Sequence, residues 1–122
     1  SDEDLGLLFP GGAVADFAAH ALAHGTTALV VTQGAQGASV WTANASTTVP
    51  GLNVDVVDTV GAGDAFQAAL LARLAETDAL SAAALVQLGQ AQWRDVLGFA
   101  ARAAAITCSR RGADMPRRSE LN

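Results

Sequence analysis

The sequence contains no lysine, and all seven of its basic residues are arginines. Acidic residues outnumber them, and the formal net charge is −5. Binding to a nucleic-acid backbone or to an anionic membrane surface requires a basic footprint, so we expect neither partner. The absence of lysine also excludes a P-loop, whose G-x-x-x-x-G-K-[ST] pattern requires one.

Cysteine and long apolar runs are scarce as well. Cys108 is the only cysteine, which excludes an internal disulfide and a cysteine-rich metal site. The longest apolar runs, TTALVV and AAAITC, are far too short to cross a bilayer. The opening SDEDLGLLFP lacks the basic stretch with which a secretory signal peptide begins. These features favour a cytoplasmic protein.

Hydrophobic patterning predicts an α/β chain with one strand buried on both faces, over 27–32, because TALVVT is a continuous β-branched run. With only one such strand ahead of a hairpin, we expect the C-terminal part of a larger sheet. The other expected elements are helices over 4–9, 13–24, 64–76, 82–88 and 93–108, a hairpin of 38–43 and 46–50, and an extended segment over 54–57.

The segment DTVGAGDAFQAALLARL, residues 58–74, combines a small-residue turn with an immediate carboxylate. Unpaired N–H groups of Ala62, Gly63 and Asp64 at a helix start would favour an anion such as a phosphoryl group. Asp64 would be repelled there unless it acts as a general base. A Rossmann fingerprint is excluded because Phe66 occupies its third small position. The residues of this segment alone leave an alternative open, in which it is an ordinary helix start without a ligand and the Asp64 carboxylate interacts favourably with the helix dipole.

This segment resembles the second signature of the ribokinase/PfkB family of carbohydrate kinases, D-T-x-G-A-G-D. VVTQGAQGASVW, residues 30–41, resembles the family's T-x-G-x-x-G nucleotide segment, and 100–121 resembles the last helix and loop of fructokinase-like members. The resemblance implies the C-terminal half of a ribokinase-like three-layer α/β/α sandwich. It places the nucleotide-binding and catalytic portion at 1–122, with the N-terminal sugar-binding half and lid absent.

The resemblance also implies the chemistry. The activity would be phosphoryl transfer from ATP, with Mg²⁺, to a sugar hydroxyl, with fructose favoured. Asp64 matches the family's catalytic base, and Gly61, Ala62 and Gly63 match its anion hole. The complete protein is expected to be a homodimer, and the isolated chain to be inactive. Two alternatives remain open: a non-catalytic nucleotide-binding remnant, and an interaction module without a sugar pocket.

Further residues match the nucleotide site and a monovalent-cation site of the family. Ala101 stands where many relatives have an adenine-proximal asparagine, so it offers no side-chain hydrogen bond. Pro116 stands where a polar cation ligand can occur. The matching nucleotide residues are Thr32, Gly34, Gly37 and Ala101, and the matching cation residues, mostly through their backbone and suited to K⁺, are Asp58, Val60, Thr107, Arg110 and Gly112.

Five other residues have simpler interpretations. His20 and His24 are four apart on one helix but have no third ligand, so a surface helix face is the favoured reading. Cys108 is expected to be a small buried apolar residue. Arg117 and Arg118 are expected to lie in a solvated tail.

Overall fold

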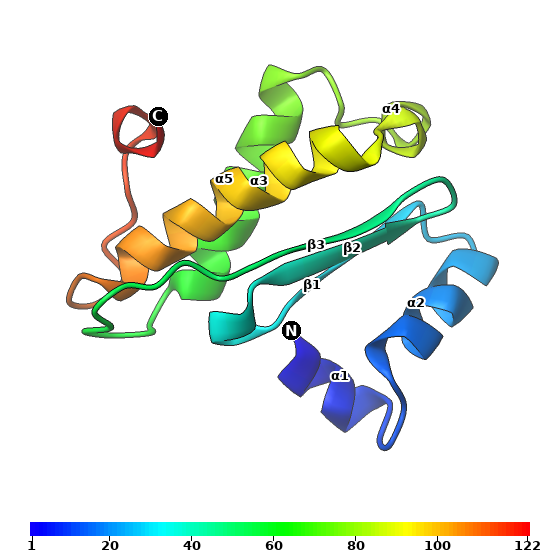
Figure 1. Cartoon of the computed structure of the whole chain (residues 1–122), viewed down its shortest axis with the longest axis horizontal. Helices are drawn as coiled ribbons and strands as arrows, with labels where there is room; N and C mark the ends of the chain where they lie inside the picture. The colour runs from blue at the N-terminus through cyan, green and yellow to red at the C-terminus, as the bar shows by residue number, and fades with distance from the viewer.

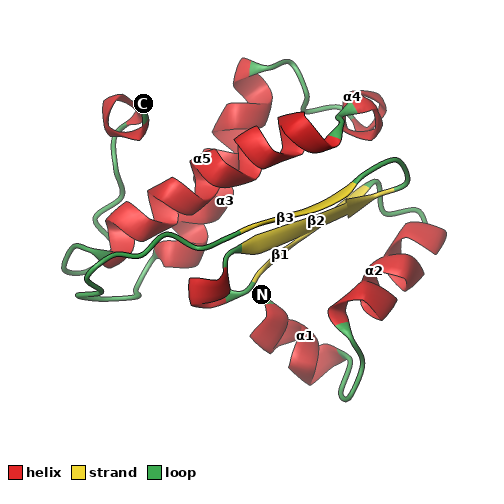
Figure 2. Cartoon of the chain, in the orientation of Figure 1, coloured by secondary structure: helices red, strands yellow, loops and turns green.

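The computed structural model describes residues 1–122 as a small sheet between helices (Figures 1 and 2). Helices α3, α4 and α5 lie on one face of the sheet, and α1 and α2 lie on the other (Figure 1). This layering confirms the α/β class. In chain order the elements are α1 (Asp2–Leu8), α2 (Val14–Ala23), β1 (Ala28–Thr32), η1 (Gly34–Gln36), β2 (Ala38–Thr42), β3 (Ser46–Val49), α3 (Ala62–Glu76), α4 (Ala82–Gln87), α5 (Gln90–Cys108) and η2 (Arg118–Leu121).

The three strands form an antiparallel sheet in the order β1-β2-β3. Val30 of β1 pairs with Val40 of β2, which pairs in turn with Thr47 of β3. The outer edge of β1 therefore has no partner strand within this chain. The prediction that this strand is buried on both faces is wrong for the chain as it stands, because only Val31 of β1 is buried.

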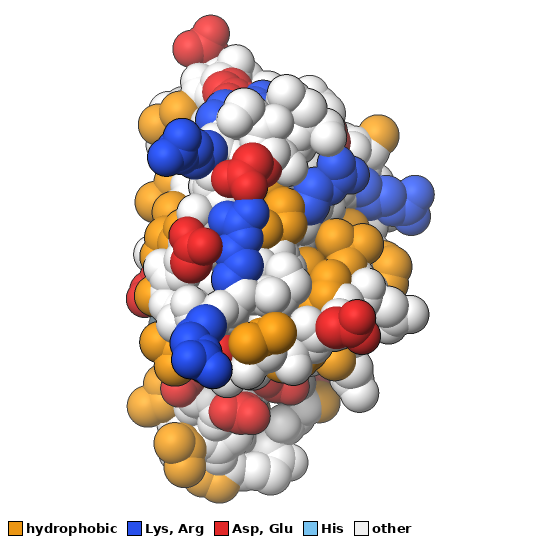
Figure 3. All heavy atoms as spheres, turned by 90° about the vertical axis from the view of Figure 1, so that its left-hand side faces the viewer, with side chains coloured by type: hydrophobic (Ala, Val, Ile, Leu, Met, Phe, Trp, Pro, Cys, Tyr) orange, Lys and Arg blue, Asp and Glu red, His pale blue; other side chains and the backbone are white.

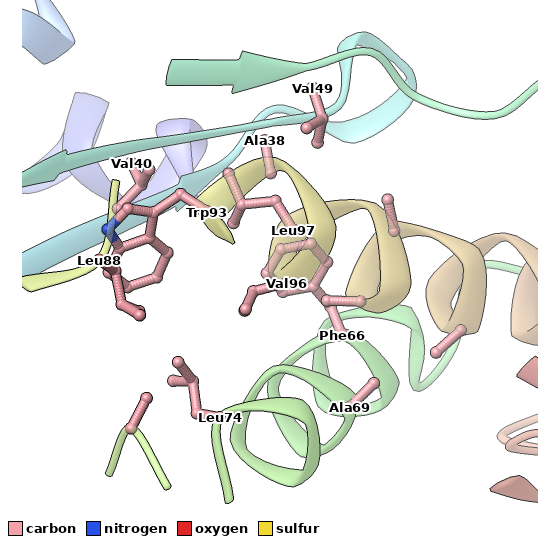
Figure 4. Packing of buried hydrophobic residues seen from close by; sticks show 14 of the residues in the cluster. Ala38, Val40, Val49, Phe66, Ala69, Leu74, Leu88, Trp93, Val96 and Leu97 are labelled. Carbon is pink, nitrogen blue, oxygen red and sulfur yellow. The ribbon is translucent and has the colours of Figure 1, made fainter. Parts of the chain in front are cut away.

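The core lies between the sheet and the α3–α5 pair. Trp93 and Leu97 of α5 are fully buried together with Val40 of β2, and Figure 4 shows them directed toward one another across the helix–sheet layer. Phe66 extends this cluster from α3. Burial of each such large side chain stabilises the fold by about 1.5–3 kcal/mol. The core therefore fixes α3, and with it the segment 58–64, against α5 and the sheet.

Local capping explains the helix starts. Ser1 accepts a hydrogen bond from the Asp4 N–H and donates one to the Asp4 carboxylate, which forms the expected cap of α1. Helix α5 begins at Gln90, three residues earlier than predicted, because the Gln92 side chain accepts the Gly89 N–H. No helix in the structure combines the length and apolarity that a membrane crossing needs.

The segment before α3 differs from the prediction. Residues 54–57 form no strand, and the side chains of Val56 and Val57 are about three-fifths exposed, at 62% and 61%. Their alternating valines follow the period of a strand. No strand of this chain pairs with them, however, and without a partner the period alone does not build a strand.

The unpaired edge of β1 predicts concentration-dependent association. Its free backbone N–H and C=O groups, together with the exposed valines of 54–57, offer a template for pairing with another chain. We expect the apparent mass in sedimentation to rise with concentration, and Val57→Lys, in the exposed segment 54–57, to reduce that rise. A monomer over the whole concentration range would contradict the expectation.

Candidate functional site

A cleft of about 420 Å³ opens between the turn after β1, the start of α3 and the C-terminal half of α5. Leu52, Val54, Val56 and Phe66 give it apolar walls. It brings together residues that are up to 69 positions apart and that the sequence had singled out separately. Those that line it are Thr32, Gly34, Gly37, Ala62, Gly63 and Ala101.

The turn after β1 depends on glycine for its shape. Gly34 and Gly37 have positive φ angles of 55° and 105°. A Cβ atom at Gly37 would collide with the carbonyl oxygen of Val49, and one at Gly51 would collide with the carbonyl oxygen of Ala35. The turn therefore packs backbone to backbone against the 49–51 segment, which leaves its outer face bare toward the cleft.

The start of α3 has the properties of an anion site. Gly61 adopts a left-handed conformation, with φ 78° and ψ 0°, as the N-cap residue. The N–H groups of Gly63 and Asp64 have no hydrogen-bond acceptor in the protein, and both residues are exposed. The Ala62 N–H was expected to be unpaired as well, but it donates to the Thr59 carbonyl at 3.3 Å. The helix dipole adds positive potential at these groups. The Asp64 carboxylate lies in this first turn, adjacent to the cleft-lining Gly63.

Asp58 joins the two loops behind this helix start. Its Oδ1 accepts the Val60 N–H at 3.0 Å, and its Oδ2 accepts the Gly112 N–H at 2.9 Å. The Val57 and Asp58 N–H groups donate to the Cys108 carbonyl. The N–H groups of Val60 and Gly112 hold the pKa of Asp58 below its ordinary value, since they favour the charged form. Asp58 therefore fixes the approach to α3.

The residues expected to bind a monovalent cation offer oxygen atoms of the kind that such a cation prefers. The carbonyl oxygens of Val60, Arg110 and Gly112 accept no hydrogen bond from the protein, and such carbonyls suit a hard cation. Asp58 holds the two loops that carry them together. Thr107 is less available, because its buried Oγ1 donates to the Ala103 carbonyl and its own carbonyl accepts the Arg110 N–H.

Replacement of Asp58 by asparagine tests the link between the loops. An amide has only one acceptor oxygen, so one of the two N–H groups at Val60 and Gly112 loses its partner. We expect faster hydrogen exchange at one or both amides and a lower thermal midpoint, with Asp55→Asn, on the exposed part of the same loop, as the matched control. Unchanged exchange at both amides would refute the link.

The same bond predicts a pH dependence in the unchanged protein. Because the pKa of Asp58 is lower in the folded state, its contribution to stability is fully present above the ordinary value of 3.8. It is lost as the pH falls through the lowered folded pKa. The Gly112 amide should therefore exchange faster, relative to the amides of α5, only below about pH 4.

The expectation of a solvated tail holds for Arg117, which is exposed, but not for Arg118. The Arg118 guanidinium donates to both carboxylate oxygens of Glu76 and lies 4.9 Å from the centre of the Phe99 ring. This contact holds the pKa of Glu76 below its usual range. Arg110 pairs with Glu120 and, at 3.8 Å, with Asp114. The side chain of Arg110 is thus engaged with the tail, so only its backbone is available to a cation.

Sequence reasoning missed the apolar walls of the cleft. Val54 and Val56 were interpreted as part of an extended segment with no stated role, and Leu52 was given no interpretation. Their position between the glycine turn and the signature was the signal available, because a chain that connects two ligand-binding segments lies beside the ligand.

The two histidines keep their simpler interpretation, whereas Cys108, which was expected to be buried, is only half-buried. His20 and His24 stack with ring centroids 4.2 Å apart, and the His24 Nδ1 lies 2.8 Å from the His20 carbonyl oxygen. No group of three or more potential metal-ligating side chains occurs in the structure. Cys108 is half-buried at the end of α5, where it borders the cleft.

The sequence was compared with known proteins. A fructokinase of Rhizobium leguminosarum bv. trifolii is 51% identical over 74 residues, which cover 61% of this chain and 23% of that protein. Probable fructokinase-4 of Arabidopsis thaliana is 36% identical over 124 aligned positions, which cover 99% of this chain and 36% of that protein. The chain thus spans about a quarter to a third of these relatives.

Solved structures of fructokinases are also similar to this chain. A fructokinase from Xylella fastidiosa with bound ATP matches 98% of this chain and 38% of its own, with a TM-score of 0.81 and 31% identity. A fructokinase from Vibrio cholerae O395, bound to fructose, ADP and calcium, matches 98% of this chain and 37% of its own with a TM-score of 0.76. The family model described as "pfkB family carbohydrate kinase" matches residues 7–119 of this chain. The chain therefore belongs to the pfkB family of carbohydrate kinases.

Proposed function

We propose that this chain is the nucleotide-binding and catalytic portion of an ATP-dependent sugar kinase. One observation carries the proposal. The unpaired N–H groups at the start of α3 and the glycine turn after β1 meet at a single cleft whose walls are apolar. Such a cleft suits a nucleotide, with its base against the apolar walls and its phosphates at the helix start.

Each residue at the helix start has a distinct task in this reaction. The Asp64 carboxylate takes the proton from the attacking sugar hydroxyl. The sugar oxygen forms a bond to the γ-phosphorus as the bond from that phosphorus to the β–γ bridging oxygen breaks, and ADP leaves. The unpaired N–H groups of Gly61, Gly63 and Asp64 stabilise the charge on the transferring phosphoryl oxygens.

ATP would supply the phosphoryl group, and Mg²⁺ would neutralise its phosphates. The turn formed by Thr32, Gly34 and Gly37 would hold the nucleotide, and Ala101 would border its base without a side-chain hydrogen bond. K⁺ would bind the free carbonyls of the loops that Asp58 joins, where it would keep the N–H groups of the turn directed inward.

Fructose is the proposed acceptor, since the sequence relatives are fructokinases and the Vibrio cholerae structure contains fructose. The contacts that select the sugar would come from residues outside these 122. We propose that the polypeptide carrying both portions is a cytoplasmic homodimer. It would need no nucleic acid or membrane partner, in keeping with the acidic net charge of −5.

The test is a kinase assay of the polypeptide that joins this chain to a sugar-binding portion, with ATP, Mg²⁺ and a panel of hexoses and pentoses. We expect phosphorylation of fructose in preference to the other sugars, and a higher rate with K⁺ than with Na⁺. ATP binding without turnover on any sugar would instead identify a nucleotide-binding remnant.

A further inference from the structure

The glycine turn after β1 and residues 49–51 touch each other through their main chains. A Cβ atom on Gly51 would lie 2.2 Å from the carbonyl oxygen of Ala35. One on Gly37 would lie 2.0 Å from the carbonyl oxygen of Val49. Neither contact involves a flexible side chain that could turn aside. The two segments therefore leave no room for a single methyl group at either point.

The two glycines of this contact differ in what their replacement would show. Gly37 has a φ of 105°, so a side chain there is strained by the backbone conformation as well as by the contact. Gly51 has no positive φ. Gly51→Ala can therefore keep the backbone angles and changes only the space between the two segments, which makes Gly51 the informative position.

Both sides of the contact line the cleft described above. Ala35 lies in η1 beside Gly34, and Gly51 precedes Leu52, and all four line the cleft. Real Cβ atoms essentially never lie within 3.0 Å of such a neighbour, so in Gly51→Ala the 2.2 Å separation must open. Whichever of the two segments moves, a wall of the cleft moves with it.

The start of α3 is insulated from such a movement. No backbone hydrogen bond joins residues 52–56 to the rest of the protein. This loop lies at the left end of Figure 1, which Figure 3 shows face on, with hydrophobic side chains at the surface. Beyond the loop, the Val57 N–H donates to the Cys108 carbonyl at 2.8 Å. The Asp58 carboxylate then accepts the Gly112 N–H at 2.9 Å. A shift at residue 51 is therefore absorbed before the chain reaches α3.

We propose that Gly51 is a positioning residue for the nucleotide, because the absence of its Cβ atom sets how closely the glycine turn and residues 50–52 approach each other. This inference rests on the proposed function, since it requires the nucleotide to bind in this cleft. Placement matters at this scale, because an error of about 1 Å can cost ~10²-fold in a positioned site. Gly51 touches no reacting atom, so its replacement should weaken nucleotide binding and leave the phosphoryl-transfer step largely unchanged.

The test is a calorimetric titration of the chain with ATP and Mg²⁺, in which Gly51→Ala is compared with Gly98→Ala. Gly98 is the matched control because it has no positive φ and a Cβ atom there would meet no atom within 4 Å. We expect the Kd for ATP to rise by at least ~10-fold in Gly51→Ala and by less than about twofold in Gly98→Ala. Equal affinity in Gly51→Ala and the unchanged chain would overturn this inference alone. Absence of ATP binding to the unchanged chain would overturn the proposed function together with it.

Two further measurements separate positioning from a general loss of stability. In the polypeptide that includes a sugar-binding portion, Gly51→Ala should raise KM for ATP by at least ~10-fold while kcat stays within about threefold. A lower kcat with an unchanged KM would contradict the inference. In NMR spectra without nucleotide, the amides displaced by Gly51→Ala should lie in 33–37 and 50–52. Displacement of the Val60 and Gly112 amides would show that the change reaches the start of α3 and would also overturn the inference.

Discussion

Replacing Asp64 with asparagine is expected to lower kcat for phosphoryl transfer by at least ~10²-fold, the low end for a positioned general base. Asparagine keeps the size of the side chain and its place in the first turn of α3 but cannot accept the hydroxyl proton. The Asp64 residue is exposed and its carboxylate makes no hydrogen bond within the protein, so the fold should not change. The measurement is steady-state kinetics on the polypeptide that includes the sugar-binding portion.

Asp55→Asn is the matched control for that measurement. It removes one exposed carboxylate from the loop that precedes the signature, so it changes the net charge by the same amount. We expect its kcat to stay within a factor of about two. If Asp64→Asn reduced kcat only by a few-fold, Asp64 would be a helix-dipole partner and not the base.

Gly61→Ala is the second change with a large expected effect. The left-handed conformation at φ 78° costs an L-residue about 1–2 kcal/mol, and the new Cβ would lie only 2.7 Å from the Cβ of Ala113. Relief of this contact moves the turn and its N–H groups. We therefore expect a lower free energy of unfolding and a loss of kcat of about 10²–10³-fold, as for removal of one oxyanion donor.

Gly63→Ala is the control that distinguishes the effect of the left-handed conformation at Gly61 from the effect of replacing any glycine in this turn. Gly63 has no positive φ, and a Cβ atom there would meet nothing within 4 Å. Within a helix this exchange should raise stability by up to about 1 kcal/mol. Thermal unfolding should thus move in opposite directions for the two variants. Equal midpoints would show that Gly61 is not held in the left-handed conformation.

The parts of the fold that depend on local sequence could be predicted. The Ser1 cap and the start of α3 follow from residues within a few positions of each other. The signature at 58–64 likewise identified the helix start, because glycine and the following apolar run determine it locally. The family resemblance added the glycine turn at 32–37, which the structure places on the same cleft.

The contacts that tie distant segments together could not be predicted from the sequence. Asp58 and Gly112 are 54 positions apart, and Glu76 and Arg118 are 42 apart. No local pattern distinguishes an arginine that will reach a carboxylate from one that stays solvated, so Arg118 was misassigned. The extended segment predicted over 54–57 is absent for a related reason. A strand requires a neighbouring strand, and the alternation of valines along the sequence does not show whether one is present.

An NMR titration of this chain with ATP and Mg²⁺ tests the central claim most directly, because it asks whether the nucleotide meets the glycine turn and the helix start together. The account predicts saturable shifts concentrated at the amides of Gly34, Gly37, Gly63 and Asp64. Binding should weaken in Gly61→Ala and persist in Asp64→Asn, which keeps the N–H groups of the turn. Absence of saturable shifts at these four amides would contradict the account.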